Sequence, residues 1–292
     1  MVYDCFTFFN ELDILEIRLN VLDKVVDKFV LVEATHTHQG KEKSLYFNEN
    51  KARYVAFADK IIHIIIDTFP KDDSNSSWTL ERYQRDKIAD GLKDAKPGDT
   101  VLISDVDEIP NPEQITAYKD KPGIKIFKQQ MFYYFLNCRN ISDNENYQWF
   151  GTAMTKYNPK LSPQLLRFLS IYMISTTEKR FVARVYSKLR VMWWKIKLMR
   201  NIYGVENGGW HFSFLGGVQM IIRKLEAFAH AEYNKEQYKD PKKIEEALDE
   251  GRDIFGRDFK YTFVPLDNTF PAYILSNKEK YKNLIREKSQ VK

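Results

Sequence analysis

The stretch Val101-Leu102-Ile103-Ser104-Asp105-Val106-Asp107-Glu108-Ile109-Pro110 decides the architecture of this chain. Its first three residues are apolar and follow the turn signal Lys96-Pro97-Gly98-Asp99, so they predict a short strand that is buried on both faces. The strand ends in two carboxylates spaced one residue apart, with a third directly after them. Because ligands in open α/β sheets bind just beyond such strand ends, this loop is the first candidate for a functional site.

Asp105 and Asp107 are candidate metal ligands. Residues i and i+2 of an extended segment project to one side, so the two carboxylates can share one hard cation, Mg²⁺ or Mn²⁺, which in turn holds a diphosphate. Glu108 would then point away or approach through a water. The alternative is a solvated acidic loop, since Asp is common after strands. The buried strand before the pair favours the metal site.

The first 110 residues alternate strand and helix signals, whereas the pattern changes beyond Gly123. Strands are predicted at 3–8, 29–32 and 61–66, and helices at 12–26 and 77–92. This βαβ rhythm predicts an α/β fold with a mostly parallel central sheet and helices on both of its faces. Later helices are expected at 217–230, 241–250 and 281–288.

Composition excludes several classes of protein. With 43% apolar and 14% aromatic residues among 292, the chain is not a disordered protein. Its two cysteines predict neither a disulfide framework nor a cysteine-based zinc site, and they fit a reducing compartment. No signal peptide opens the sequence, and no apolar run reaches transmembrane length. We therefore expect a cytoplasmic protein, either free or peripheral at the inner face of the membrane.

The segment 179–200 carries many Lys and Arg side chains and no acid. Apolar residues lie between them, including the pair Trp193-Trp194, and this pattern predicts contact with an anionic membrane surface. A helix that packs its apolar face on the core while the lysine stems snorkel explains the pattern equally well. The segment supplies much of the net charge of +5, so the remainder gives little support for nucleic-acid binding.

Four blocks of this sequence resemble glycosyltransferase family 17. They follow the order of the family and comprise Asp4 to Gly40, Trp78 with Arg85-Asp86, Asp105 to Pro110, and Gly209-Trp210-His211-Phe212-Ser213. Enzymes of this family add bisecting N-acetylglucosamine to the core mannose of N-glycans, and they have bacterial and viral relatives. The resemblance covers about residues 1–230. It implies an inverting, metal-dependent transferase with a GT-A-like, Rossmann-type fold and UDP-N-acetylglucosamine as the expected donor.

The resemblance also implies a domain organisation and an acceptor. We expect one glycosyltransferase domain over 1–292, with a nucleotide-sugar-binding half at 1–110, an acceptor-side half at 111–270 and a C-terminal helical tail at 271–292. The Golgi members carry a membrane anchor, whereas this chain begins at the first family block. A bacterial or viral member that acts on a glycan or lipid-linked saccharide is therefore expected.

The site residues follow from these blocks. The metal ligands are expected to be Asp105, Asp107 and His211, and the donor contacts are expected to be Glu33, Thr35, Arg85, Asp86, Asp105, Gly209 and Trp210. His36 and His38 are interpreted as loop residues over the nucleotide. For several of these residues a simpler role is open: Glu33 as an ordinary strand-end acid, Arg85 and Asp86 as members of surface ion pairs, and His211 as a packed residue or a diphosphate contact.

An inverting displacement also needs a carboxylate that takes the proton of the acceptor hydroxyl as it attacks. The sequence leaves four candidates for this base: Asp143, Glu145, Glu206 and Glu108.

Two other classes compete with a transferase. A phosphohydrolase of the haloacid dehalogenase type also places Asp-x-Asp after an apolar strand, but near the N-terminus and without the Ile109-Pro110 that follows here. A non-catalytic carbohydrate- or membrane-binding module on a transferase fold is the second alternative. The intact pair of Asp105 and Asp107 argues against this module.

Overall fold

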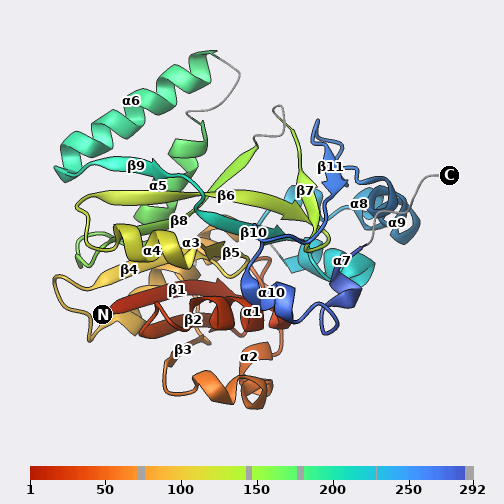
Figure 1. The fold of residues 1–292 in the computed structure, drawn as a ribbon, viewed down its shortest axis with the longest axis horizontal. Helices are drawn as coiled ribbons and strands as arrows, with labels where there is room; N and C mark the ends of the chain where they lie inside the picture. The colour runs from red at the N-terminus through yellow and green to blue at the C-terminus, as the bar shows by residue number, and fades with distance from the viewer. Residues whose placement is uncertain (71–75, 143–146, 176–180, 228, 287–292) are drawn as a thin grey trace.

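The computed structural model describes residues 1–70, 76–142, 147–175, 181–227 and 229–286 (Figure 1). Its strands are β1 (Val2–Phe8), β2 (Lys28–Ala34), β3 (Ile61–Ile66), β4 (Thr100–Asp105), β5 (Glu108–Pro110), β6 (Ile124–Tyr133), β7 (Cys138–Asn140), β8 (Gln148–Lys156), β9 (Ile202–Val205), β10 (Gly209–Ser213) and β11 (Tyr261–Phe263). Its α-helices are α1 (Leu12–Leu22), α2 (Tyr46–Glu49), α3 (Ser77–Asp86), α4 (Pro112–Tyr118), α5 (Pro163–Ser175), α6 (Phe181–Leu198), α7 (Gly217–Ala227), α8 (Glu236–Lys239), α9 (Pro241–Glu250) and α10 (Ala272–Ser276). Short 3-10 helices are η1 (Lys51–Phe57), η2 (Lys87–Leu92), η3 (Ala231–Tyr233) and η4 (Lys282–Leu284).

One 11-stranded sheet forms the centre of the molecule, with the order β11-β7-β6-β8-β4-β1-β2-β3 along its main path. The prediction of an α/β fold is confirmed, and the four strands β3, β2, β1 and β4 are parallel as expected. The expected mostly parallel sheet is not confirmed, because the sheet is mixed: β8 lies between β4 and β6 and pairs antiparallel with both, whereas β9 and β10 pair parallel with β6. The described residues between β6 and β8 contain strand β7 and no helix, which fits the antiparallel pairing of these strands.

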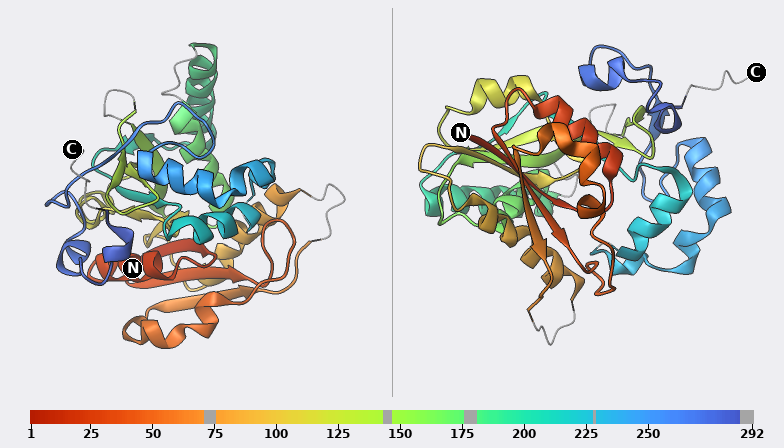
Figure 2. Two further views of the ribbon diagram at one scale, coloured as in Figure 1. Left: turned by 90° about the vertical axis from the view of Figure 1, so that its right-hand side faces the viewer. Right: turned by 90° about the horizontal axis from the view of Figure 1, so that it is seen from below.

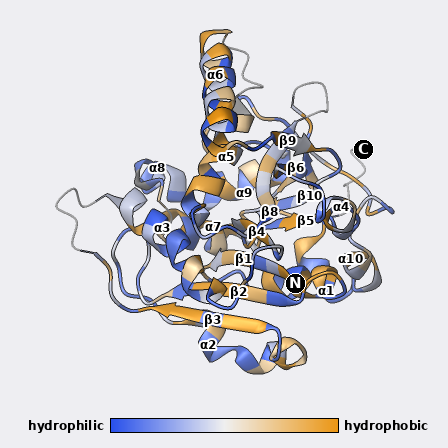
Figure 3. Cartoon of the chain, turned by 90° about the vertical axis from the view of Figure 1, so that its left-hand side faces the viewer, coloured by the Kyte–Doolittle hydropathy of each residue, from blue (hydrophilic) through white to orange (hydrophobic). Residues whose placement is uncertain are grey.

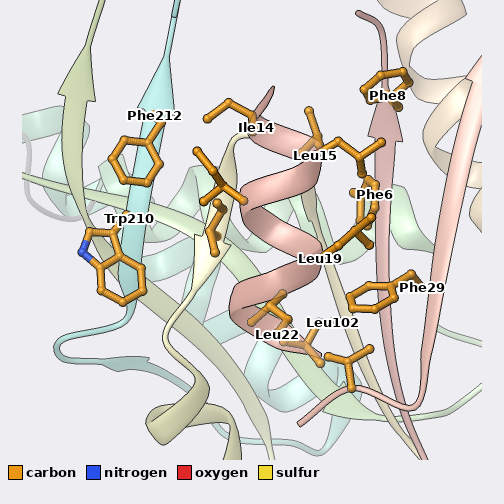
Figure 4. Close-up of a cluster of buried hydrophobic side chains, with 14 of the residues drawn as sticks. Phe6, Phe8, Ile14, Leu15, Leu19, Leu22, Phe29, Leu102, Trp210 and Phe212 are labelled. Atoms are coloured by element: carbon orange, nitrogen blue, oxygen red, sulfur yellow. The ribbon is translucent and has the colours of Figure 1, made fainter. Parts of the chain in front are cut away.

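Helix α1 covers one face of the parallel strands. Its apolar stripe of Leu15, Leu19 and Leu22 lies beside Phe6 of β1, and Trp210 of β10 belongs to the same apolar cluster (Figure 4). Strand β1 also contributes Tyr3 and Cys5 to a second apolar cluster on the opposite face of the sheet, together with residues of η2 and α5. Strands β1, β2 and β4 are thus buried on both faces, as their apolar runs predict, whereas the edge strand β3 is half-buried.

The C-terminal part completes the molecule around this sheet. Helices α7 and α9 begin at the predicted residues and pack on β6 through a third apolar cluster that includes Ile221, Leu225 and Ile244. The described part of the tail contains only α10 and η4, and Ile274 and Leu284 bury it in the same cluster as α1. Two further views show α6 standing out from the body, while α7 and α9 lie side by side (Figure 2).

Candidate active site

A pocket of about 610 Å³ lies where the parallel strands β1 and β4 end. Its wall includes Thr7 at the end of β1, the turn between β4 and β5, and side chains from β10, α3, α5 and α7. Elements from the whole length of the chain therefore meet at the carboxyl edge of the parallel strands, where the sequence predicts a ligand site.

Arg18 of α1 fixes the turn that carries the acidic motif. Its side chain is fully buried, and its Nε and Nη2 donate to the carboxylate of Asp4 at 2.8 and 2.6 Å. Its Nη1 donates to the backbone carbonyl oxygens of Asp105, Val106 and Glu108 at 2.9, 3.1 and 3.0 Å. Buried carbonyl groups need donors, so this one guanidinium holds the shape of the turn.

Asp105 lies between two arginines. Its Oδ1 accepts from Arg85 Nη2 of α3 and its Oδ2 from Arg167 Nη2 of α5, both at 2.8 Å. Burial alone would raise the pKa of this carboxyl, but the charges of Arg167 and Arg85 outweigh burial and lower the pKa below its ordinary value. Asp105 is therefore ionised throughout the neutral range.

Glu108 joins the ion-pair network that Asp105 forms with Arg85 and Arg167. Its two oxygens accept from Nη1 of Arg167 at 2.7 and 2.9 Å, and Oε1 also accepts from Trp149 Nε1 at 2.6 Å. Its Oε2 further accepts the backbone N–H of Asp105 at 3.1 Å. Because donors occupy both oxygens of this buried side chain, Glu108 positions Arg167 and is poorly placed to act as a base.

Asp107 points to a different set of partners. Its Oδ2 accepts from Lys224 Nζ of α7 at 3.0 Å, and its Oδ1 lies 3.6 Å from His211 Nε2 of β10. Burial would raise the pKa of Asp107, but Lys224 and His211 lower it below its ordinary value. Burial likewise would lower the pKa of Lys224, but Asp107 raises it, so the ammonium stays charged in the pocket.

His211 and Trp210, both expected at the site, lie on opposite faces of β10. His211 and Ser213 line the pocket, whereas Trp210 points to the core, where its Nε1 donates to Thr269 O at 2.9 Å. The Nδ1 atom of His211 is buried without a hydrogen-bond partner, and its ring lies 4.9 Å from that of Trp149. Of the two residues of β10, His211 therefore faces the pocket and Trp210 does not.

The expected metal ligands divide into two sets. Asp107 and His211 lie together, whereas both oxygens of Asp105 are bound by arginines. Among the residues that the structure describes, no three His, Cys, Asp or Glu side chains form a metal-binding group. Asp107 and His211 offer one hard oxygen and one imidazole nitrogen, which fits a cation that takes its other ligands from a bound phosphate or from water.

Of the expected donor contacts at the second strand, Glu33 and Thr35 lie outside the pocket. Glu33 is fully buried and accepts the backbone N–H of Phe47 at 2.9 Å, so it anchors α2. Thr35 Oγ1 lies 2.9 Å from His36 Nδ1. His36 and His38 do line the pocket, as interpreted from the sequence, and His38 Nε2 lies 2.7 Å from Gln84 Oε1.

Asp86 and Gly209 also lie outside the pocket. Asp86 is exposed and accepts the backbone N–H of Gln164 at 3.0 Å, which caps the start of α5. Gly209 has a φ of +124°, and a Cβ atom there would lie 2.2 Å from Ile109 O. Its role is the close approach of β10 to β5, whereas Arg85, next to Asp86, is buried and reaches the pocket.

The structure describes two of the four carboxylates that the sequence offers as the base. Asp143 and Glu145 lie outside the described residues. Glu206 is exposed, pairs with Lys128 and does not line the pocket. Glu108 lines the pocket but is bound by donors as described above.

Two other carboxylates line the pocket. Glu11 and Glu81 are 17% and 18% exposed, so both are accessible from the pocket. Glu81 forms an i,i+4 ion pair with Arg85 at 2.8 Å, and Glu11 Oε1 lies 3.6 Å from Lys224 Nζ.

Three further residues, Arg167, Lys224 and Trp149, line the pocket and were not expected from the sequence. A signal existed for Arg167, because it is the only charged side chain in the apolar helix α5. Lys224 gives no such signal, since it follows Arg223 on a helix of mixed polarity. These three residues come from elements that only the tertiary fold brings to the turn.

Comparison with known proteins places this chain in a class of transferases. The profile of glycosyltransferase family 17 matches residues 1–147, about half of the chain, so the chain belongs to this family. The β-1,4-mannosyl-glycoprotein 4-β-N-acetylglucosaminyltransferases of Homo sapiens and Rattus norvegicus are each 32% identical to it over 107 residues, and that of Mus musculus is 31% identical. The matched stretch covers 35% of this chain and 20% of each of these relatives.

Proposed function

We propose that this protein is an inverting glycosyltransferase of GT-A-like fold that transfers N-acetylglucosamine from UDP-N-acetylglucosamine to a hydroxyl of a glycan or lipid-linked saccharide. One observation carries the proposal: Arg85, Arg167 and Lys224 surround the acidic turn of Asp105 and Asp107 in one pocket. Fixed positive charges in a partly closed pocket stabilise a departing diphosphate. The family membership and the pocket volume, which lies within about 300–1,000 Å³ for small-molecule sites, support the same conclusion.

In this proposal Asp107 and His211 hold Mn²⁺ or Mg²⁺. When bound, the cation neutralises negative charge on the leaving diphosphate. Lys224, next to Asp107, contributes a second positive charge that does not depend on the metal. Asp105 orients Arg85 and Arg167 toward the donor, because each of its oxygens holds one guanidinium.

We further propose that Glu11 or Glu81 takes the proton of the acceptor hydroxyl. Both carboxylates line the pocket and remain partly accessible, whereas the oxygens of Glu108 are occupied by donors. Glu11→Gln and Glu81→Gln separate the two, because loss of the base lowers kcat while donor binding persists. Asp143 and Glu145 remain predicted bases, and D143N and E145Q test them in the same assay.

The decisive experiment is calorimetric binding of UDP-, GDP- and CMP-sugars with and without Mn²⁺. We expect metal-dependent binding of one UDP-sugar by the native protein and its loss in Asp107→Asn. Asp13→Asn is the matched control, because Asp13 pairs with Arg53 at the surface and lies outside the pocket.

Each other outcome contradicts the proposal. Phosphate release from simple phosphomonoesters would favour the phosphohydrolase, and saccharide binding without nucleotide binding or turnover would favour the non-catalytic module. Equal binding with and without Mn²⁺ would refute the metal role of Asp107 and His211.

A further inference from the structure

Helix α6 presents an unusual surface. It packs on α5 through a narrow face, in which only Ser187 and Val191 are buried. The opposite face is apolar and solvent-exposed, with Val182 at 78% and Ile196 at 70% exposure. The exposed apolar side chains of α6 are Phe181, Val182, Val185, Tyr186, Leu189, Met192, Trp193 and Ile196.

These exposed side chains form one continuous stripe. Val182, Val185, Leu189, Trp193 and Ile196 are spaced three or four residues apart, so they share one side of a helix with 3.6 residues per turn. The ribbon coloured by hydropathy shows apolar and polar residues alternating along α6 where it extends beyond the body (Figure 3). An exposed stripe of this length marks an interaction site, because soluble surfaces rarely carry one.

Basic residues border the stripe on both sides. By the same helical periodicity, Arg184, Lys188 and Lys195 lie along one edge, and Arg190 and Lys197 lie along the other. No acid occurs between residues 181 and 200. The surface therefore combines an apolar centre with two positive margins, and its partner must be apolar with negative charge at the edges.

This charge pattern separates the candidate partners. A second copy of α6 would bring like-charged margins together, because this helix has no acid to pair with them. A lipid surface with anionic headgroups meets both requirements, since acyl chains receive the stripe and phosphates receive the margins. None of the described helices is long and apolar enough to cross a membrane.

We propose that α6 docks on an anionic lipid surface, with its exposed stripe inserted below the headgroups and its basic margins on the lipid phosphates. The helix lies parallel to that surface and does not span it. Helix α5, on which α6 packs, carries Arg167 into the pocket, so docking fixes the orientation of the site relative to the membrane. The inference rests on α6 alone and does not depend on the proposed reaction.

Co-sedimentation of the full chain with vesicles tests the inference. We expect binding to phosphatidylcholine vesicles that contain phosphatidylglycerol and weak binding to pure phosphatidylcholine, with the difference reduced by high salt. Leu189→Glu and Ile196→Glu should each weaken binding about tenfold or more, because each removes a buried apolar side chain from the lipid. Val55→Glu is the matched control, since Val55 is 73% exposed on η1, away from α6.

A second readout follows the helix itself. Brominated lipids should quench the fluorescence of Trp193 in the native protein, and Trp193→Phe should remove that quenching. Circular dichroism of the variants should match the native protein, because the substituted side chains are exposed.

Three outcomes would overturn the inference: no binding to anionic vesicles, the same loss of binding in Val55→Glu, or binding that is unchanged by Leu189→Glu and Ile196→Glu. A dimer in sedimentation velocity that dissociates in Ile196→Glu would also overturn it, because a second copy would then cover the stripe. Nucleotide binding in these variants reports separately on the proposed function.

Discussion

The guanidinium of Arg18 and the carboxylate of Asp4 form a fully buried ion pair with two hydrogen bonds, of 2.8 and 2.6 Å. This pair leaves Nη1 of Arg18 free to bind three carbonyl oxygens of the turn that carries the acidic motif. The pair therefore connects the first strand and the first helix to the geometry of the pocket. Neither residue lines the pocket, so both are positioning residues.

Asp4→Asn should destabilise the protein by about 3–5 kcal/mol, because it leaves the charge of Arg18 buried without its partner. Urea unfolding measures this change. Asp13→Asn is the control, since Asp13 forms an exposed pair with Arg53 and its loss should cost at most about 1 kcal/mol. Equal losses of unfolding free energy in the two variants would show that burial of the Arg18–Asp4 pair does not contribute to stability.

Asp105→Asn and Asp107→Asn should separate stability from activity. Both should lower turnover at least about a hundredfold, because each removes charge from the diphosphate site. Asp105→Asn should also lower the free energy of unfolding more than Asp107→Asn, since it leaves the buried Arg85 and the half-buried Arg167 without a shared partner. Parallel transfer assays and unfolding curves measure both effects, and a larger loss of stability in Asp107→Asn would contradict the assignment.

The stability of the protein should depend on Asp105 at low pH. The charges of Arg167 and Arg85 overcome burial and hold the native pKa below the value of about 3.9 in the unfolded chain. The contribution of Asp105 is therefore fully present above that value and is lost as pH falls toward the native pKa. Below about pH 4 the unfolding free energy of the native protein should fall with a steeper slope than that of Asp105→Asn. Identical slopes in urea unfolding from pH 7 to 3 would refute the shift.

Gly209→Ala should destabilise the protein by more than about 1 kcal/mol, because it combines a positive φ with a clash against Ile109 O. Gly40→Ala isolates the backbone cost, since Gly40 has a φ of +80° and nothing lies within 4 Å of the Cβ position. The difference in thermal midpoint between the two variants measures the close approach of β5 and β10. If the two midpoints coincide, that approach is not tight.

The parallel half of the fold was predictable because its signals are local. The apolar runs of β1, β2 and β4 report burial on both faces, and the periodic stripe of α1 reports its buried side. The antiparallel half was not predictable in the same way. Strand β8 could extend the parallel pattern or reverse it, and its position between β4 and β6 depends on long-range pairing.

The residues of the candidate site were also predictable only in part. The strand ending at Asp105 and the carboxylate of Asp107 were evident, whereas Glu33, Thr35, Asp86, Gly209 and Trp210 belong to the scaffold around the pocket. Adjacent residues of a strand point to opposite faces, so a sequence block that contains both His211 and Trp210 could not tell which of them faces the ligand.

The sequence by itself determined that a buried strand delivers Asp105 and Asp107 to a pocket at the edge of an α/β sheet, because hydrophobic period and polarity are properties of neighbouring residues. Only the tertiary structure decided that Arg167 and Lys224 balance those charges and that Arg18 holds their turn. Ion pairs between distant segments depend on how helices pack on the sheet, and no local pattern encodes that packing.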